Sequence, residues 1–261
     1  MRGQLPGGNL NNTSMDAFDE ASLLLPKDYV CPVCNKEFTS MRVLSGKAMS
    51  DGMDYDLRPL YKNIDPLKYR ALECPVCGYA DIDIVFNKIH KREIAELKKK
   101  MDYKDLEDYT PESVRDYRMA YSHFKAVIRC NLIRGAKSSK RAHAALWTAW
   151  LLRNWRDSLE KNGETVAPDD TMGINEENKL LKYTLRNFKD AEFKESFPMS
   201  NIDEPTLYYI MAAIYYSQND YRNSQQYVLQ VLQNRSVSGI LRTKAEDLKE
   251  DIREQIRAGK A

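Results

Sequence analysis

The sequence predicts a mainly α-helical protein with a small β-structured head at its N-terminal end, and three observations support this. Four cysteines form two C-x-x-C pairs within the first hundred residues. Short segments typical of strands flank these pairs. From Ile89 onward, apolar residues recur every three or four positions, which is the spacing of amphipathic helices. We therefore expect a disordered tail over residues 1–27, a β domain over 28–88 and a helical domain over 89–261.

Composition and charge limit the class of protein. Of the 261 residues, 43% are hydrophobic and 30% are charged, which is enough apolar material for a core and too much for a disordered chain. The net charge of +2 argues neither for nor against a polyanionic partner. No run approaches the roughly 18 apolar residues that span a bilayer, and residues 1–20 lack the apolar core of a secretory signal. We expect a cytoplasmic protein without a membrane span.

The two cysteine pairs, Cys31-Pro32-Val33-Cys34 and Cys74-Pro75-Val76-Cys77, predict a tetrahedral site with four thiolate ligands. The residue after each pair usually adopts a left-handed backbone, which Gly78 supplies without strain and Asn35 tolerates. Because sulfur fills all four positions, no position is open for water and the ion should be structural. The predicted cofactor is Zn²⁺, and the predicted ligands are Cys31, Cys34, Cys74 and Cys77.

Other interpretations of the cysteines stay open. Iron suits the same sulfur cage, two unmetallated buried pairs are chemically feasible, and a dithiol redox role would need a context that the sequence does not show. The fifth cysteine, Cys130, falls on a predicted helix and is expected to be a buried structural thiol. The five cysteines together fit a reducing compartment better than a disulfide framework.

The head should consist of short strands around the cysteine pairs. Residues 41–44 have strand-like content before Ser45-Gly46 interrupts them, and 69–73 lead as a strand into the second pair. Residues 79–86 alternate in polarity, as in a half-buried strand. The 39 residues between the pairs are many for a compact zinc ribbon, so loop 47–68 is expected to pack against the head.

Several short motifs occur in a fixed order along the chain. They are the first cysteine pair, Asp54-x-Asp56, Pro59-Leu60-Tyr61, Pro66-Leu67-Lys68-Tyr69, the run Cys74–Ala80 and Ala149-Trp150-Leu151-Leu152-Arg153. In this order they resemble the bacterial family catalogued as domain of unknown function 2225, from about Tyr29 to roughly residue 215. Leu152 stands where that family has tyrosine. The resemblance carries no activity; it implies a zinc-ribbon-like head followed by tetratricopeptide-like helices.

Capping signals delimit the first helices of the body. Residues 89–101 are expected to form a charged connecting helix. Thr110 offers an N-cap before a proline, and Gly135 ends the helix that follows. Ser138 or Ser139 should cap the next helix, which is apolar on nearly all sides and should therefore be the central helix of the body. A further helix is expected over about 175–195 and a terminal one over 238–257.

One helix pair resembles a tetratricopeptide repeat. Asp203-Glu204-Pro205 starts the first helix, and the small residues Ala212 and Ser224 would let the two helices approach closely. Such pairs often present the inner face of the first helix to a peptide. The residues on that face, which we predict as partner-binding, are Tyr209, Ala213, Tyr216 and Ser217; the alternative is that the two tyrosines only pack against the preceding helix.

Positive charge is concentrated in the middle of the chain. Ten lysines and arginines but only two aspartates fall between Arg115 and Asp157. A basic patch around a helix–helix turn could meet phosphates, although such runs are usually solvated faces. The residues of this predicted patch are Arg129, Arg134, Lys137, Lys140 and Arg141.

No catalytic constellation stands out. The histidines His90, His123 and His143 fall on separate segments, and no nucleotide-binding loop or hydrolase elbow occurs. We therefore expect a non-enzymatic protein-interaction module, an adaptor or scaffold with a structural zinc head and a tetratricopeptide-like antiparallel helical body. The alternative is a nucleic-acid-binding zinc ribbon that uses the basic middle region.

Overall fold

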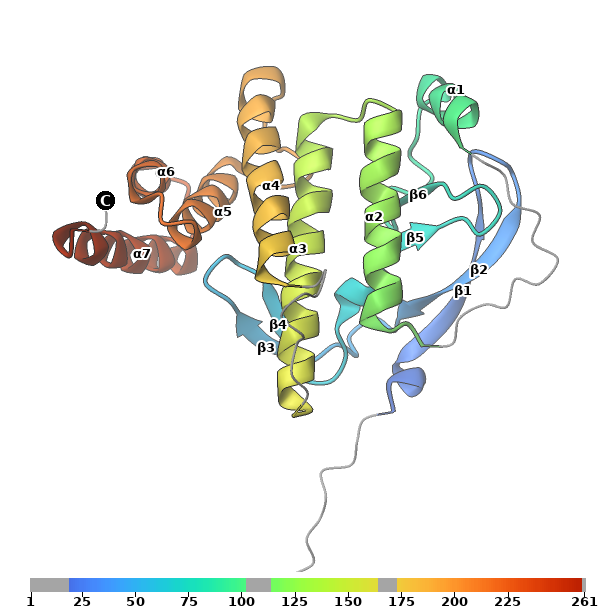
Figure 1. Ribbon diagram of the computed structural model, residues 1–261, viewed down its shortest axis with the longest axis horizontal. Helices are drawn as coiled ribbons and strands as arrows, with labels where there is room; N and C mark the ends of the chain where they lie inside the picture. The colour runs from blue at the N-terminus through green and yellow to red at the C-terminus, as the bar shows by residue number, and fades with distance from the viewer. Residues whose placement is uncertain (1–18, 102–113, 164–172, 260–261) are drawn as a thin grey trace, which may run out of the picture.

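The computed structural model describes residues 19–101, 114–163 and 173–259. Figure 1 shows a small β region behind and beside the helices α2 and α3, with α5, α6 and α7 at the opposite end. The described residues form seven α-helices and six short strands, so the predicted mainly helical fold with an N-terminal β head is confirmed.

The head consists of three separate antiparallel hairpins. The first pairs β1 (Leu24–Val30) with β2 (Glu37–Val43), and the last pairs β5 (Ala71–Glu73) with β6 (Ala80–Ile82). Between them, β3 (Ser50–Met53) pairs with β4 (Pro59–Tyr61) and is followed by the short 3-10 helix η2 (Pro66–Tyr69). Each cysteine pair therefore lies in the turn of a hairpin, and the β3–β4 hairpin occupies the long interval between them.

Two sequence-based expectations for the head are wrong. Residues 19–27 are not part of a tail, because they form the 3-10 helix η1 (Glu20–Leu23) and most of β1, and bury Leu23 and Leu24 against Ile64 and Tyr69. The strand expected over 79–86 ends at Ile82, where a turn begins that leaves Ile84 50% exposed. Residues 1–18 lie outside the described residues.

The helical body begins with α1 (Lys91–Lys100) beside the head. Helices α2 (Tyr117–Ile133), α3 (Ser138–Lys161) and α4 (Ile174–Lys194) then run antiparallel to their neighbours along the chain (Figure 1). Helices α5 (Glu204–Ser217), α6 (Tyr221–Gln233) and α7 (Gly239–Arg257) complete the chain. None of the described helices combines the length and apolar composition needed to cross a membrane.

The first two long helices begin differently from the prediction. Helix α2 starts at Tyr117 and is capped by Asp116, whose carboxylate accepts the N–H of Met119 at 2.7 Å, so Val114 precedes it; Thr110 lies outside the described residues. Helix α3 is preceded by Lys137, and the first-turn serines do not cap it. Their hydroxyls instead donate to carboxylates on and just after α4, Ser138 to Asp190 and Ser139 to Glu195.

Helix α3 is the centre of the molecule, as its apolar composition predicts. One face of α3, including Leu146 and Ala149, packs into a core with α4, α5, α6 and α7. Its other face, including Leu151 and Leu152, packs with α2, the head and the cysteines. The main core of the head is therefore shared with the helices, and only the small cluster around Leu23, Leu24, Ile64 and Tyr69 is confined to the head, although the sequence suggested a boundary near residue 88.

The predicted close contact between α5 and α6 is present. Ser224 is fully buried and its hydroxyl donates to the carbonyl of Ala212 at 2.8 Å. Asn219 takes a left-handed backbone in the turn between the helices, and Asp220 caps α6. The assignment of this pair to the tetratricopeptide repeats stays a prediction.

Candidate metal centre and the adjoining cleft

The two cysteine turns have the same backbone geometry. In the first, Asn35 N–H donates to the Cys31 carbonyl at 2.8 Å; in the second, Gly78 N–H donates to the Cys74 carbonyl at 2.8 Å. Asn35 has φ 60° and Gly78 φ 68°, so both residues adopt the left-handed conformation that the sequence predicts. The turns face each other and bring the four cysteines together in the core.

The cysteine sulfurs fit a tetrahedral metal ion. All four Sγ atoms lie within 4.8 Å of one another, and the Cys31–Cys77 and Cys34–Cys74 Sγ pairs are each 3.6 Å apart. A tetrahedron with Zn–S bonds of about 2.3 Å has sulfur–sulfur edges of about 3.8 Å. Cys31, Cys74 and Cys77 are buried and Cys34 is half-buried. The cluster can therefore hold one ion without an open coordination position.

Without a cation, Cys31, Cys74 and Cys77 would not all ionise together. The hydrogen bond with Cys74 raises the pKa of Cys31, and the same contact lowers the pKa of Cys74. The hydrogen bond with Cys31 also raises the pKa of Cys77. A divalent cation would stabilise the fully ionised cluster, which is the usual coupling between metal binding and proton release.

The fifth cysteine supports the second cysteine turn. Cys130 on α2 is buried, and its sulfur accepts the Ala80 N–H at 3.3 Å, three residues after Cys77. Burial raises the pKa of this thiol to about 11, so it is poorly reactive. The prediction of a buried structural thiol is confirmed.

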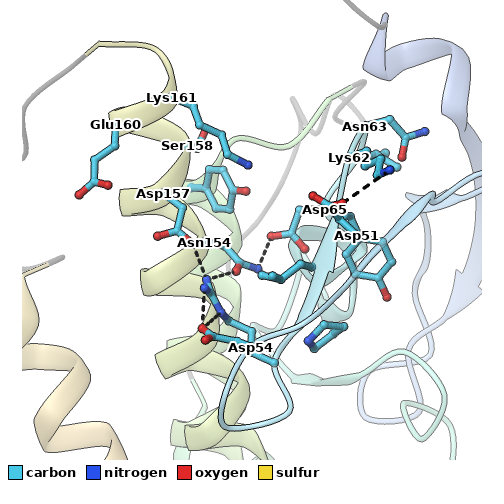
Figure 2. A pocket seen from close by; sticks show the side chains of 16 residues that line it. Asp51, Asp54, Lys62, Asn63, Asp65, Asn154, Asp157, Ser158, Glu160 and Lys161 are labelled. Carbon is cyan, nitrogen blue, oxygen red and sulfur yellow. Dashed lines mark hydrogen bonds and ion pairs between the residues drawn. The ribbon is translucent and has the colours of Figure 1, made fainter. Parts of the chain in front are cut away.

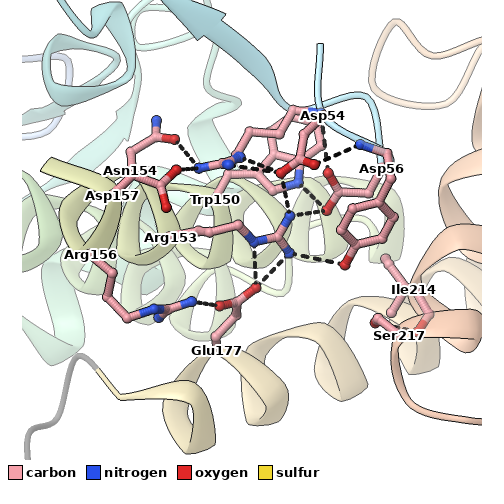
Figure 3. Close-up of polar contacts among 12 residues, drawn as sticks. Asp54, Asp56, Trp150, Arg153, Asn154, Arg156, Asp157, Glu177, Ile214 and Ser217 are labelled. Atoms are coloured by element: carbon pink, nitrogen blue, oxygen red, sulfur yellow. Dashed lines mark hydrogen bonds and ion pairs between the residues drawn. The ribbon is translucent and has the colours of Figure 1, made fainter. Parts of the chain in front are cut away.

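The motifs Asp54-x-Asp56 and Ala149–Arg153 meet in space, although about a hundred residues separate them (Figure 3). Asp56 is fully buried, and its carboxylate accepts the indole N–H of Trp150 and the guanidinium of Arg153, both at 3.0 Å. Arg153 also donates to Asp54 at 3.1 Å and to Glu177 on α4 at 2.5 Å. The network joins the β3–β4 turn to α3 and α4.

Arg58 extends this network along α3. Its guanidinium donates to Asp54 at 2.7 Å, to Asn154 at 2.6 Å and to Asp157 at 2.7 Å. Burial alone would lower the pKa of Arg153, but the charges of Asp56 and Glu177 outweigh it and raise that pKa. These carboxylates are thus neutralised by arginines, which makes the network structural and disfavours a metal ion within it.

A cleft opens beside the network, between the β3–β4 hairpin and the C-terminal half of α3 (Figure 2). Its volume is about 620 Å³, and charged groups such as Asp51, Lys62, Asp157 and Lys161 line it. A second cavity of about 380 Å³ adjoins it and is more apolar, with Trp147 and Trp150 in its walls. The residues common to both linings are Pro59, Tyr61, Asp65 and Asn154.

The four predicted partner-binding residues differ in how far they are exposed to solvent. Tyr209 and Ala213 are buried, so they cannot line an open groove. The Tyr209 hydroxyl donates to the Tyr55 carbonyl at 2.8 Å, because the β3–β4 turn covers this part of α5. Tyr216 is half-buried and Ser217 is exposed. The prediction that Tyr209 and Ala213 line an open groove is therefore wrong. A partner-binding role for Tyr216 and Ser217 stays a prediction.

The predicted basic patch is divided. Arg134 points inward, where its guanidinium donates to the buried Asp81 on β6 at 2.8 Å. Arg141 contacts the Ser138 hydroxyl at 2.9 Å and lies 4.0 Å from Asp190. Arg129 and Lys137 are exposed, and Lys140 is half-buried. The five side chains thus do not present one positive surface, because the fold uses Arg134 as an internal ion-pair partner.

Replacing Arg134 by methionine should destabilise the protein by about 3–5 kcal/mol, because the substitution leaves the Asp81 carboxylate buried without a counterion. Urea unfolding followed by circular dichroism measures this loss. The matched control is Lys137→Met, an exposed site three residues along, for which a change within about 0.5 kcal/mol is expected. Equal effects of the two substitutions would show that the Arg134–Asp81 pair does not hold α2 to the head.

The histidines do not assemble into a site. Burial lowers the pKa of His123 to about 3 and that of His143 to about 4, so both are neutral near pH 7. His143 packs edge-on against Trp147, with ring centroids 4.4 Å apart. His90 stands directly before α1.

Asp54, Asp56 and the Ala149–Arg153 motif stand out in the sequence, but no local pattern pairs them with one another. Arg58, Asp65 and Glu177 were not predicted as site residues. Arg58 directly precedes the motif Pro59-Leu60-Tyr61, and Asp65 directly precedes the motif Pro66-Leu67-Lys68-Tyr69. This position is the only feature of the sequence that distinguishes the two residues from other charged residues nearby. Glu177 lies within an ordinary charged stretch of α4, so only the packing of α3 on α4 reveals its role.

A comparison with protein families agrees with the observed motifs. The family model described as "Uncharacterized protein conserved in bacteria (DUF2225)" matches residues 24–258. The match extends beyond the range that the motifs suggested and includes α6 and α7. No curated protein matches the chain. No solved structure matches it either.

Proposed function

The chain belongs to the DUF2225 family of bacterial proteins. We propose that this protein is a non-enzymatic protein-interaction module with a structural Zn²⁺ ion. In this proposal the cysteine site holds the head in place, and a segment of a partner protein enters the cleft between the β3–β4 hairpin and α3. The observation that carries the proposal is the pair of adjoining cavities with tyrosine and tryptophan side chains in their walls.

The dimensions and lining of the cavities support binding. Volumes of about 620 and 380 Å³ fall within the range of roughly 300–1,000 Å³ that is usual for ligand pockets. Tryptophan and tyrosine contribute strongly at interfaces, because they bury much area with little loss of rotamer freedom. The ion-pair network beside the cavities fixes the hairpin, so the cleft is preorganised.

The cysteine geometry supports a structural role for the metal. Four sulfur ligands leave no position for water or substrate, and zinc is the proposed ion because a closed sulfur tetrahedron is its usual structural site. Elemental analysis of the purified protein should find about one zinc per chain. Iron in the cage would instead give a coloured protein with visible absorption, and well under one metal per chain would contradict the proposal.

The protein-partner proposal is tested by crosslinking capture in the native host with three variants. Tyr61→Ala removes an aromatic side chain from both cavities, Tyr216→Ala changes the surface of α5, and Lys62→Ala is the control at the cleft rim. The expected result is a defined protein that wild type and Lys62→Ala capture and Tyr61→Ala loses. Thermal melts verify that each variant is folded.

Two outcomes of this capture would contradict the proposed site. If only Tyr216→Ala loses the partner, the partner binds the surface of α5 and not the cleft. Recovery of nucleic acid, with binding that falls steeply as salt rises, would favour the nucleic-acid alternative.

A further inference from the structure

Asp65 differs from the other carboxylates around the cleft. It stands in the wall that both cavities share, and its carboxylate accepts the Asn154 side-chain N–H at 2.8 Å and the Leu67 N–H at 2.9 Å. Figure 2 shows it in the centre of the cleft, facing Asn154. Among the described residues that line the cavities, Asp54 and Asp157 are bound by Arg58, whereas Asp65 forms no ion pair.

The basic side chain whose charge acts on Asp65 is already engaged elsewhere. Lys68 follows Asp65 by one turn, but its ammonium pairs with Glu20 at 2.6 Å and is buried there. Desolvation therefore dominates the environment of Asp65 and raises its pKa above the ordinary range. A half-buried carboxylate without a counterion is unfavourable unless something else supplies the positive charge.

Aromatic side chains surround this carboxylate. Tyr61 lines both cavities with Asp65, and Trp147 and Trp150 line the more apolar one. A carboxylate beside aromatic faces is the usual recognition site for an organic cation, because the charge binds the acid and the hydrocarbon stem covers the rings. Trp147 already holds one guanidinium in this way, since the Arg70 guanidinium carbon lies 5.4 Å from its ring centroid.

Arg70 does not fill this role for Asp65. Its guanidinium pairs with Asp83 at 3.0 Å, so its charge is balanced by a carboxylate that is not among the lining residues. Lys62 is likewise paired with Asp51 at the rim, with 3.6 Å between the charged atoms. Within the described lining, Asp65 is thus a carboxylate that no basic side chain pairs with and that a cationic ligand can neutralise.

We propose that the two cavities bind a basic side chain, arginine or lysine, of a partner protein segment, with the cationic group on Asp65 and the stem against Tyr61 and Trp147. The inference rests on the proposed protein-interaction function and specifies the chemistry of the partner. Arginine fits best, because its planar fork can meet the carboxylate with two hydrogen bonds while it stacks on an aromatic ring.

The test uses three short blocked peptides, Gly-Arg-Gly, Gly-Lys-Gly and the uncharged control with citrulline in place of arginine. Binding to the zinc-loaded full chain is followed through the indole N–H signals of its three tryptophans in NMR titrations. The arginine peptide should shift the Trp147 and Trp150 signals, and the citrulline peptide should bind at least about tenfold more weakly, because it lacks the charge-assisted contact.

Asp65→Asn is the decisive variant and Asp51→Asn its matched control. Asparagine keeps an acceptor for the Leu67 N–H but removes the charge, so affinity for the arginine peptide should fall about tenfold. Asp51 lies exposed at the rim of the same cleft, and Asp51→Asn should change the affinity by less than about twofold.

Thermal melts show whether Asp65→Asn folds. The pKa of Asp65 is higher in the folded protein than in the unfolded chain. As pH rises from the unfolded to the folded pKa value, ionisation of Asp65 therefore lowers the free energy of unfolding of the wild-type protein. The variant lacks this loss but also lacks the oxygen that accepts the Asn154 N–H. Its melting temperature relative to wild type should therefore rise as pH rises through this interval. The titratable and polar side chains that act on Asp65 include Tyr61, Lys68, Tyr117 and Asn154.

Equal binding of the arginine and citrulline peptides, or equal affinity of wild type and Asp65→Asn, would overturn the inference. Free arginine amide that binds as tightly as the peptide would overturn the assignment to a protein segment and favour a small cation. If the Tyr61-dependent capture succeeds while no basic peptide binds, the proposed function stands and this inference fails. If both fail, both proposals are wrong.

Discussion

Replacing Cys77 by serine is expected to unfold the β head and to loosen α2 and α3. The four cysteines lie in the same core as these helices, so loss of the metal removes support from both hairpins and from the faces that pack on them. Structural zinc contributes apparent binding free energies of about 10–16 kcal/mol in zinc-finger peptides. That is comparable with the entire stability of a typical domain, about 5–15 kcal/mol.

Circular dichroism, thermal melts and metal content measured on the same samples test this prediction. Cys130→Ala is the matched control, because that thiol is equally buried and next to the second cysteine turn but is not one of the four clustered cysteines. The control should retain its metal and lose only a few kcal/mol, about the cost of a small core truncation. A Cys77→Ser protein with wild-type metal content and melting temperature would show that the cluster is not the structural site proposed here.

Replacing Arg153 by methionine should cost about 3–5 kcal/mol in the free energy of unfolding. Methionine preserves much of the side-chain volume but leaves the buried Asp56 without a charged partner, while Glu177 keeps its ion pair with Arg156. The fully buried Asp56 would be the most affected, because it has no access to water. Urea unfolding measures the loss, and Lys161→Met on the exposed end of α3 provides the control.

A second substitution distinguishes charge from packing. If uncompensated charge causes the loss, adding Asp56→Asn and Glu177→Gln to Arg153→Met should restore part of the stability, because neutral amides cost less to bury than carboxylates. If the triple variant is no more stable than the single one, packing of the arginine stem is the main contribution. Since the same network fixes the β3–β4 hairpin, Arg153→Met should also weaken any ligand bound in the adjoining cleft.

Local signals predicted most of the elements. Cysteine spacing identified the four residues that could hold a metal ion, and the left-handed backbone expected after each pair is present at Asn35 and Gly78. Apolar periodicity located the long helices to within a few residues, because each helix buries a stripe of its own side chains. Errors occurred where two local signals competed, as at Ser138 and Ser139, whose hydroxyls bind carboxylates of the α4 region instead of capping α3.

Surface properties were predicted less well, since burial depends on elements far away in the chain. Tyr209 has the position of a groove residue within α5, yet the β3–β4 turn covers it. Arg134 belongs to a basic run in the sequence, yet β6 provides Asp81 as its partner. Neither contact leaves a local pattern, because each joins residues more than fifty positions apart.

The sequence by itself determined that this protein has a four-cysteine head on a helical body, because metal-ligand spacing and helical periodicity are local properties. Only the tertiary structure brought Asp54 and Asp56 to Trp150 and Arg153, and only it enclosed Asp65 within an aromatic-lined cleft. These contacts depend on how the β3–β4 hairpin docks on α3. Docking is decided by the packing of the whole core and by the pairing of buried charges, which no single stretch of sequence specifies.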